Sequence, residues 1–246
     1  APNVVHNPTY LLMVPLMTFM WWLFTRRVLD RSDNRWLLLL IFAGVSAVTA
    51  FAKPSFHLAF GAAACVIVLA RLRKDLSSIP YFARVGLAIV LPVALQMPML
   101  AGAGPTQWEG TSFSLRPFYG FNQIVGDPLG AVFSSLLFIG FVTVLLGIRR
   151  PEARNFRFSL ILLFFSALVL LLFAEDGPRV MHGNFFWTIY AGVLLAFVEG
   201  AAYALGRLGR GPDGRRAWAC FAILGLHAAF GAYYLLYVAM FVGPMA

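Results

Sequence analysis

Ionisable residues concentrate in one short stretch of this 246-residue chain, Glu175–Trp187, which reads Glu-Asp-Gly-Pro-Arg-Val-Met-His-Gly-Asn-Phe-Phe-Trp. A carboxylate of Glu175 or Asp176 near His182 can serve as a general base. Arg179 can hold a leaving phosphate, because a fixed cation stabilises negative charge that develops during a reaction. This stretch is therefore the first candidate for a catalytic site.

The alternative for the same stretch is a structural turn. In that interpretation Gly-Pro reverses the chain, Arg179 pairs with an acid and Asn184 caps the next helix. The density of ionisable groups favours a functional role for at least two of them. Two adjacent carboxylates are by themselves a poor metal site. We therefore expect no metal and no cofactor, with a divalent cation as the open alternative.

Four further polar residues precede this stretch in the sequence. Lys53 and His57 are four residues apart and share one helix face, so they can line the same cavity as the 175–187 turn. Equally, Lys53 can extend its amine to the membrane surface, and His57 can be a hydrogen-bonded structural histidine. His6 precedes an Asn-Pro helix start, and Arg116 lies in an aromatic-rich loop. The candidate substrate-binding residues are His6, Lys53, His57, Arg116, Arg179 and Asn184.

The composition places these residues in a membrane protein. Hydrophobic residues make up 61% of the chain and charged residues only 12%, whereas soluble domains are roughly half apolar and about a quarter charged. Runs of about 20 apolar residues can cross a bilayer as helices. The sequence predicts an all-α integral membrane protein, a single transmembrane domain over 1–246, with membrane lipids as partners. Eight spans are predicted, at roughly 9–28, 36–52, 56–72, 82–103, 128–148, 158–174, 185–206 and 218–243.

The basic residues predict the orientation of these spans. Sixteen of the nineteen lysines and arginines fall in alternate loops, and the other set of loops holds only Lys53, Arg116 and Arg179. Basic loops stay in the cytoplasm, so both termini and the polar motifs are expected on the non-cytoplasmic side. The same rule explains the net charge of +9 without a nucleic-acid partner.

Several helix starts on the outer side suit an anion. Asn7-Pro8 and Asp127-Pro128 look like a cap followed by a proline in the first turn, and Lys53-Pro54 is similar. Helix N-termini carry partial positive charge and free N–H groups. Together with the three outer cations, they predict a phosphate or pyrophosphate site at the level of the lipid headgroups.

Three motifs of the outer side form a pattern: His6-Asn-Pro-Thr-Tyr, Lys53-Pro-Ser-Phe, and Glu175 followed by Gly177, Arg179 and His182-Gly-Asn-Phe-Phe-Trp. This pattern resembles the middle and C-terminal part of bacterial polytopic envelope-polysaccharide proteins similar to GT-C type lipid-linked-sugar glycosyltransferases. The resemblance implies glycosyl transfer from a polyprenyl-phosphate-linked sugar, on the outer face of the bacterial cytoplasmic membrane.

The resemblance has one departure. GT-C enzymes place a catalytic acid in the first outer loop after the first span, and the first span of this chain enters directly from outside. The resemblance then implies that the acid lies on a preceding segment of a longer protein. Lys53, Glu175, Arg179 and His182 would line the substrate cavity. Two other classes stay open: a non-catalytic subunit that packs against other membrane subunits, and a transporter.

Overall fold

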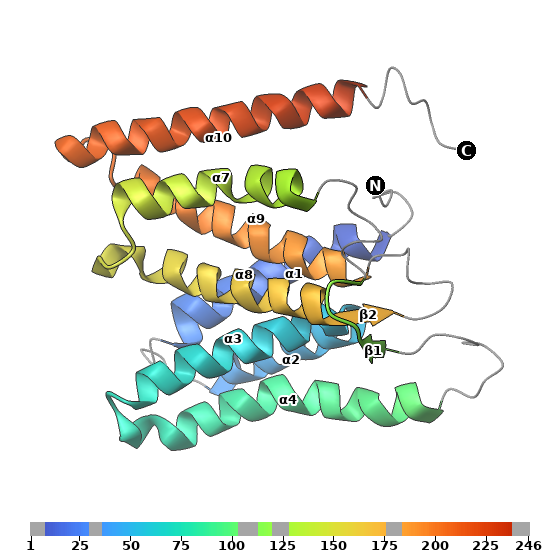
Figure 1. Cartoon of the computed structure of the whole chain (residues 1–246). Coiled ribbons are helices and arrows are strands. Elements are labelled where there is room, and N and C mark those ends of the chain that lie inside the picture. The colour runs from blue at the N-terminus through green and yellow to red at the C-terminus, as the bar shows by residue number, and fades with distance from the viewer. Residues whose placement is uncertain (1–7, 30–35, 103–112, 120–127, 176–183, 238–246) are drawn as a thin grey trace. The chain divides into compact units, whose positions relative to one another are not determined.

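The chain is predominantly helical, as predicted. The computed structural model describes all residues except 1–7, 30–35, 103–112, 120–127, 176–183 and 238–246 (Figure 1). The described residues form eight α-helices, namely α1 (Pro8–Leu23), α2 (Trp36–Ala52), α3 (Pro54–Leu72), α4 (Ile79–Gly102), α7 (Pro128–Leu146), α8 (Arg154–Leu172), α9 (Asn184–Leu205) and α10 (Pro212–Tyr237). A π-helical turn (Phe24–Val28), two 3-10 turns (Leu76–Ser78 and Pro151–Ala153) and two short strands, β1 (Phe113–Leu115) and β2 (Phe173–Glu175), complete the elements.

Each of the eight predicted apolar runs forms one of these α-helices. Pro8, Pro54 and Pro128 are the first residues of α1, α3 and α7, because proline has no N–H to lose in a first turn and its φ is already helical. Among the described residues, four helical segments are long and apolar enough to cross a membrane: Pro54–Leu72, Leu76–Leu95, Pro151–Leu172 and Phe186–Leu205.

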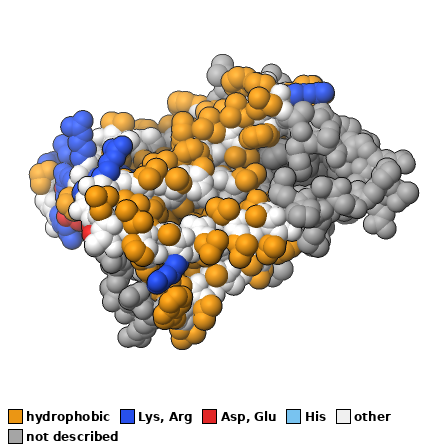
Figure 2. All heavy atoms as spheres, turned by 90° about the horizontal axis from the view of Figure 1, so that it is seen from below, with side chains coloured by type: hydrophobic (Ala, Val, Ile, Leu, Met, Phe, Trp, Pro, Cys, Tyr) orange, Lys and Arg blue, Asp and Glu red, His pale blue; other side chains and the backbone are white. Residues whose placement is uncertain are grey.

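The chain divides into two compact units. Unit 1 comprises Ala1–Pro128 and Phe158–Leu195, and unit 2 comprises Leu129–Arg157 and Ala196–Ala246. In unit 1, α2 packs against α1, α3 and α4. An aromatic cluster lies at the centre of this packing, and the rings of Phe24 and Phe60 meet edge to face at 5.3 Å. The outer surfaces of α2, α3 and α4 carry large exposed apolar side chains such as Leu40, Leu69 and Leu87, and hydrophobic side chains predominate on the face shown in Figure 2.

Unit 2 is held together by aromatic side chains around the second half of α9. Phe138 of α7 lies 4.9 Å from Phe197, and Phe156 of α8 stacks on Tyr203 at 6.2 Å between ring centres. A Cβ atom at Gly200 would meet the Phe156 ring at 3.1 Å. The small residue therefore lets these rings approach the α9 backbone.

Gly192 allows an equally close approach of α8 and α9 in unit 1. A Cβ atom there would lie 2.9 Å from the Ser166 hydroxyl oxygen and 3.2 Å from the Leu163 Cα. We expect Gly192→Ala to lower the free energy of unfolding by about 1–3 kcal/mol, because backbone cannot move aside as a side chain can. Unfolding of the purified chain in detergent measures this effect.

Gly44, in the middle of α2, is the matched control, because a Cβ atom added there would have nothing within 4 Å of it. Gly44→Ala should raise the free energy of unfolding by about 0.5–1 kcal/mol through helix propensity. Equal effects at the two glycines would contradict close packing at Gly192.

Candidate functional site

Lys53 joins α2 to α3 as a one-residue connection. Its N–H donates to the Thr49 carbonyl at 2.9 Å, and its carbonyl accepts from the His57 N–H at 3.2 Å. The backbone leaves the helical region only at Lys53, with φ −150° and ψ 80°, because Pro54 disfavours a helical conformation in the preceding residue. Lys53 is only 6% exposed. The sequence therefore places a buried lysine at the N-terminus of α3.

A buried hydrogen bond joins the start of α3 to the start of α9. The Thr188 hydroxyl donates to the Ser55 hydroxyl oxygen at 2.8 Å, across 133 residues of sequence. Ser55 lies two residues after Lys53, and Thr188 lies in the first turns of the helix that begins at Asn184. The bond thus joins the Lys53-Pro-Ser-Phe motif to Thr188, the residue directly after the 175–187 stretch.

The strands β1 and β2 link two more candidates. They pair antiparallel, with Phe113 opposite Glu175. The Arg116 N–H, just after β1, donates to the Leu172 carbonyl at 3.0 Å, and its exposed guanidinium lies 5.3 Å from the centre of the Tyr119 ring. Arg116 and Glu175 therefore belong to one short ribbon at the end of α8. The sequence predicted a loop here and missed this pairing.

His57 connects α3 to α4. Its side chain is 1% exposed, and its Nε2 lies 2.8 Å from the Ile89 carbonyl oxygen and 3.4 Å from the Ser46 hydroxyl oxygen. This geometry corresponds to the structural histidine of the two interpretations. A role for His57 in substrate binding stays a prediction.

Pro92 explains why the Ala88 carbonyl of α4 is available to a side chain of another helix. In a helix the Ala88 carbonyl would accept from the N–H of residue 92, and proline has none. The Ser46 hydroxyl donates to the Ala88 carbonyl instead, at 2.9 Å. Ser46, Ser55 and Thr188 were not among the predicted site residues. The only sequence signal for the role of Ser46 is Pro92 on another helix. This proline deprives the Ala88 carbonyl of its helical N–H donor.

The remaining predicted site residues are only partly within the described chain. His6, Asp176, Arg179 and His182 lie outside the described residues, as do the side chains of Glu175 and Asn184. The predicted base, the predicted phosphate-binding arginine and the alternative divalent cation therefore stay predictions.

A second polar site lies in unit 2, where Asp213 of α10 pairs with several arginines. Its carboxylate accepts from Arg150 and from Arg207, and it lies 3.6 Å from a nitrogen of Arg216. Glu152 lies 3.7 Å from Arg207 and is more exposed. The sequence predicted basic loops without a functional site in this region. Nothing in the local sequence pattern shows which carboxylate would pair with these arginines.

Comparison of the chain with known protein families, with curated proteins and with solved structures finds no match. Within the part of the chain that the structure describes, the fold is that of a helical protein with four helical segments long and apolar enough to cross a membrane.

Proposed function

We propose that this chain is an integral protein of the bacterial cytoplasmic membrane with about eight transmembrane helices and both termini outside. In this proposal it acts in cell-envelope glycan assembly, by glycosyl transfer from a polyprenyl-phosphate-linked sugar on the outer face. The orientation rests on the loop distribution of the lysines and arginines, sixteen of which fall on the cytoplasmic side.

The hydrogen bond between Thr188 and Ser55 carries the proposal. It holds the N-termini of α3 and α9 at one end of unit 1, next to the buried Lys53. Two partial positive charges and an amine favour an anion there. On the outer side this end lies at the level of lipid headgroups, where the phosphate of a polyprenyl-linked sugar is the anion we propose.

The reaction that fits this arrangement is a substitution at the anomeric carbon. The acceptor hydroxyl oxygen bonds to that carbon, and the carbon–oxygen bond to phosphate breaks. Polyprenyl phosphate leaves with the electron pair, and a base takes the acceptor proton. Lys53 would stabilise the leaving phosphate, and Glu175, Asp176 and His182 are the candidates for the base.

Lys53→Met tests the proposal in proteoliposomes that contain the full chain and a polyprenyl-phosphate-linked sugar. We expect release of polyprenyl phosphate to fall about 100-fold, the usual effect of removing one group that stabilises a leaving oxyanion. The helix signal of the variant in detergent shows whether its folding is retained, so that a loss of rate can be separated from a loss of structure.

Lys74→Met is the matched control, since Lys74 is exposed in the turn after α3. It removes the same charge at a distant point in the sequence and should leave the rate unchanged. Equal rates for the Lys53→Met variant and the unaltered protein would contradict the proposed role of Lys53.

A second candidate is a non-catalytic subunit of a membrane complex. The hydrogen bond between His57 of α3 and the Ile89 carbonyl of α4 favours this candidate, because it gives one predicted site residue a structural role. If the folded, unaltered chain releases no polyprenyl phosphate with any donor sugar, the subunit becomes the better explanation.

A further inference from the structure

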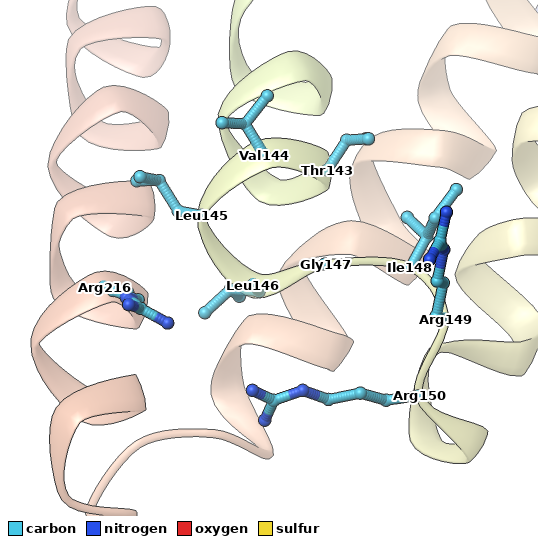
Figure 3. A pocket seen from close by; sticks show the side chains of 9 residues that line it. All are labelled: Thr143, Val144, Leu145, Leu146, Gly147, Ile148, Arg149, Arg150 and Arg216. Carbon is cyan, nitrogen blue, oxygen red and sulfur yellow. The ribbon is translucent and has the colours of Figure 1, made fainter.

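A pocket of about 410 Å³ lies in unit 2, where α7 ends and α10 begins. Its walls near α7 are apolar, from Val144, Leu145, Leu146 and Ile148. Figure 3 shows the side chains of Arg150 and Arg216 extending toward each other beside Leu146. The pocket therefore combines a hydrocarbon wall with two converging guanidinium groups.

The backbone around this pocket is held in place. Gly147 follows the last residue of α7 with φ +72°, the left-handed conformation that commonly ends a helix. The Tyr203 hydroxyl lies 2.9 Å from the Gly147 carbonyl oxygen and 3.2 Å from that of Leu146. Arg150 is held by its two contacts with Asp213. A site whose groups are fixed before binding loses little entropy when a ligand arrives.

Positive charge exceeds negative charge at the pocket. Arg149, Arg150 and Arg216 line it, and Asp213 is the only carboxylate that pairs with any of them among the described residues. Asp213 is shared with Arg207. No carboxylate in the described part of the chain pairs with Arg149. This excess favours an anion, and arginine suits phosphate because its planar group donates two parallel hydrogen bonds.

Two candidate membrane spans have an end beside the pocket, which would place it at the depth of lipid headgroups. The candidate span Pro151–Leu172 begins directly after Arg150, and the candidate span Phe186–Leu205 ends two residues before Arg207. Val144 is highly exposed, so an acyl chain can run along α7 from the pocket. A soluble anion would not use this apolar wall.

We propose that this pocket binds the phosphate of an anionic phospholipid headgroup. Arg150 and Arg216 hold the phosphate, Arg149 adds positive charge at the pocket wall, and the end of α7 contacts the upper part of the acyl chains. This proposal rests on the proposed function only in that the chain spans a membrane; it uses none of the residues of the proposed glycosyl-transfer site in unit 1.

Native mass spectrometry of the full chain in detergent, with added phosphatidylglycerol or phosphatidylcholine, tests the proposal. We expect the unaltered chain to retain phosphatidylglycerol at least about tenfold better than phosphatidylcholine. The Arg149→Gln, Arg216→Gln double variant should lose most of this preference. Arg216 is half exposed and its contact with Asp213 is long, so the variant should remain folded.

Arg215→Gln is the matched control, because Arg215 is exposed, adjacent in sequence and not part of the pocket lining. It should keep the lipid preference. The proposal is overturned if the double variant retains phosphatidylglycerol like the unaltered chain, or if the control loses it equally. It is also overturned if inorganic phosphate displaces the lipid completely, since a free phosphate would then be the ligand.

Discussion

Asp213→Asn is expected to lower the free energy of unfolding by about 3 kcal/mol, the usual effect of removing one partner from a buried ion pair. The Asp213 side chain is only 14% exposed and contacts Arg150, Arg207 and Arg216. Without its charge, three guanidinium groups repel one another, and that of Arg207 is largely buried. The measurement is the unfolding of the purified chain in detergent, monitored by the loss of its helix signal.

Glu152→Gln is the matched control for this prediction. It also removes one carboxylate charge near Arg207, at 3.7 Å, but the Glu152 side chain is 51% exposed. Exposed pairs contribute less than about 1 kcal/mol and are screened by salt. A similar loss for both variants, abolished in both by high salt, would show that Asp213 acts only as a surface charge.

Ser46→Ala is expected to lower the free energy of unfolding by about 1–2 kcal/mol, because it leaves the Ala88 carbonyl without a donor inside the helix bundle. The Ser46 hydroxyl donates to that carbonyl at 2.9 Å and lies 3.4 Å from Nε2 of His57. The reason for this dependence is Pro92, which cannot supply the helical N–H.

The double variant with Pro92→Ala tests that reason. Alanine at residue 92 restores an N–H four residues after Ala88, where α4 is helical. In this background Ser46→Ala should cost less than about 0.5 kcal/mol, a coupling of about 1 kcal/mol between the two positions. Equal costs of Ser46→Ala in both backgrounds would mean that Pro92 does not create the need for Ser46.

Thr49→Val is the control for the comparison of Ser46→Ala with and without Pro92→Ala. The Thr49 hydroxyl also donates to a carbonyl, that of Val45 at 2.7 Å, but within its own helix. That carbonyl already has a helical N–H partner, so losing the hydroxyl should cost little. It should also show no coupling to Pro92→Ala.

The amino-acid sequence by itself determined the helices and most of their starts. The predicted span 36–52 coincides with α2, and the predicted 185–206 differs from α9 by one residue at each end. Both follow from local chemistry, because about 20 apolar residues favour a helix in a membrane and proline favours a first turn.

Only the tertiary structure decided which side chains of different helices meet. The bonds from Thr188 to Ser55 and from Arg150 to Asp213 join residues 133 and 63 positions apart. A hydroxyl or a carboxylate has no sequence pattern that names its partner, because its energy depends on an atom within about 3 Å, in the required direction. Apolar burial depends only on how much surface leaves water, so apolar residues appear in runs and periodic patterns that can be recognised in the sequence. Hydrogen bonds and ion pairs between helices produce no such pattern.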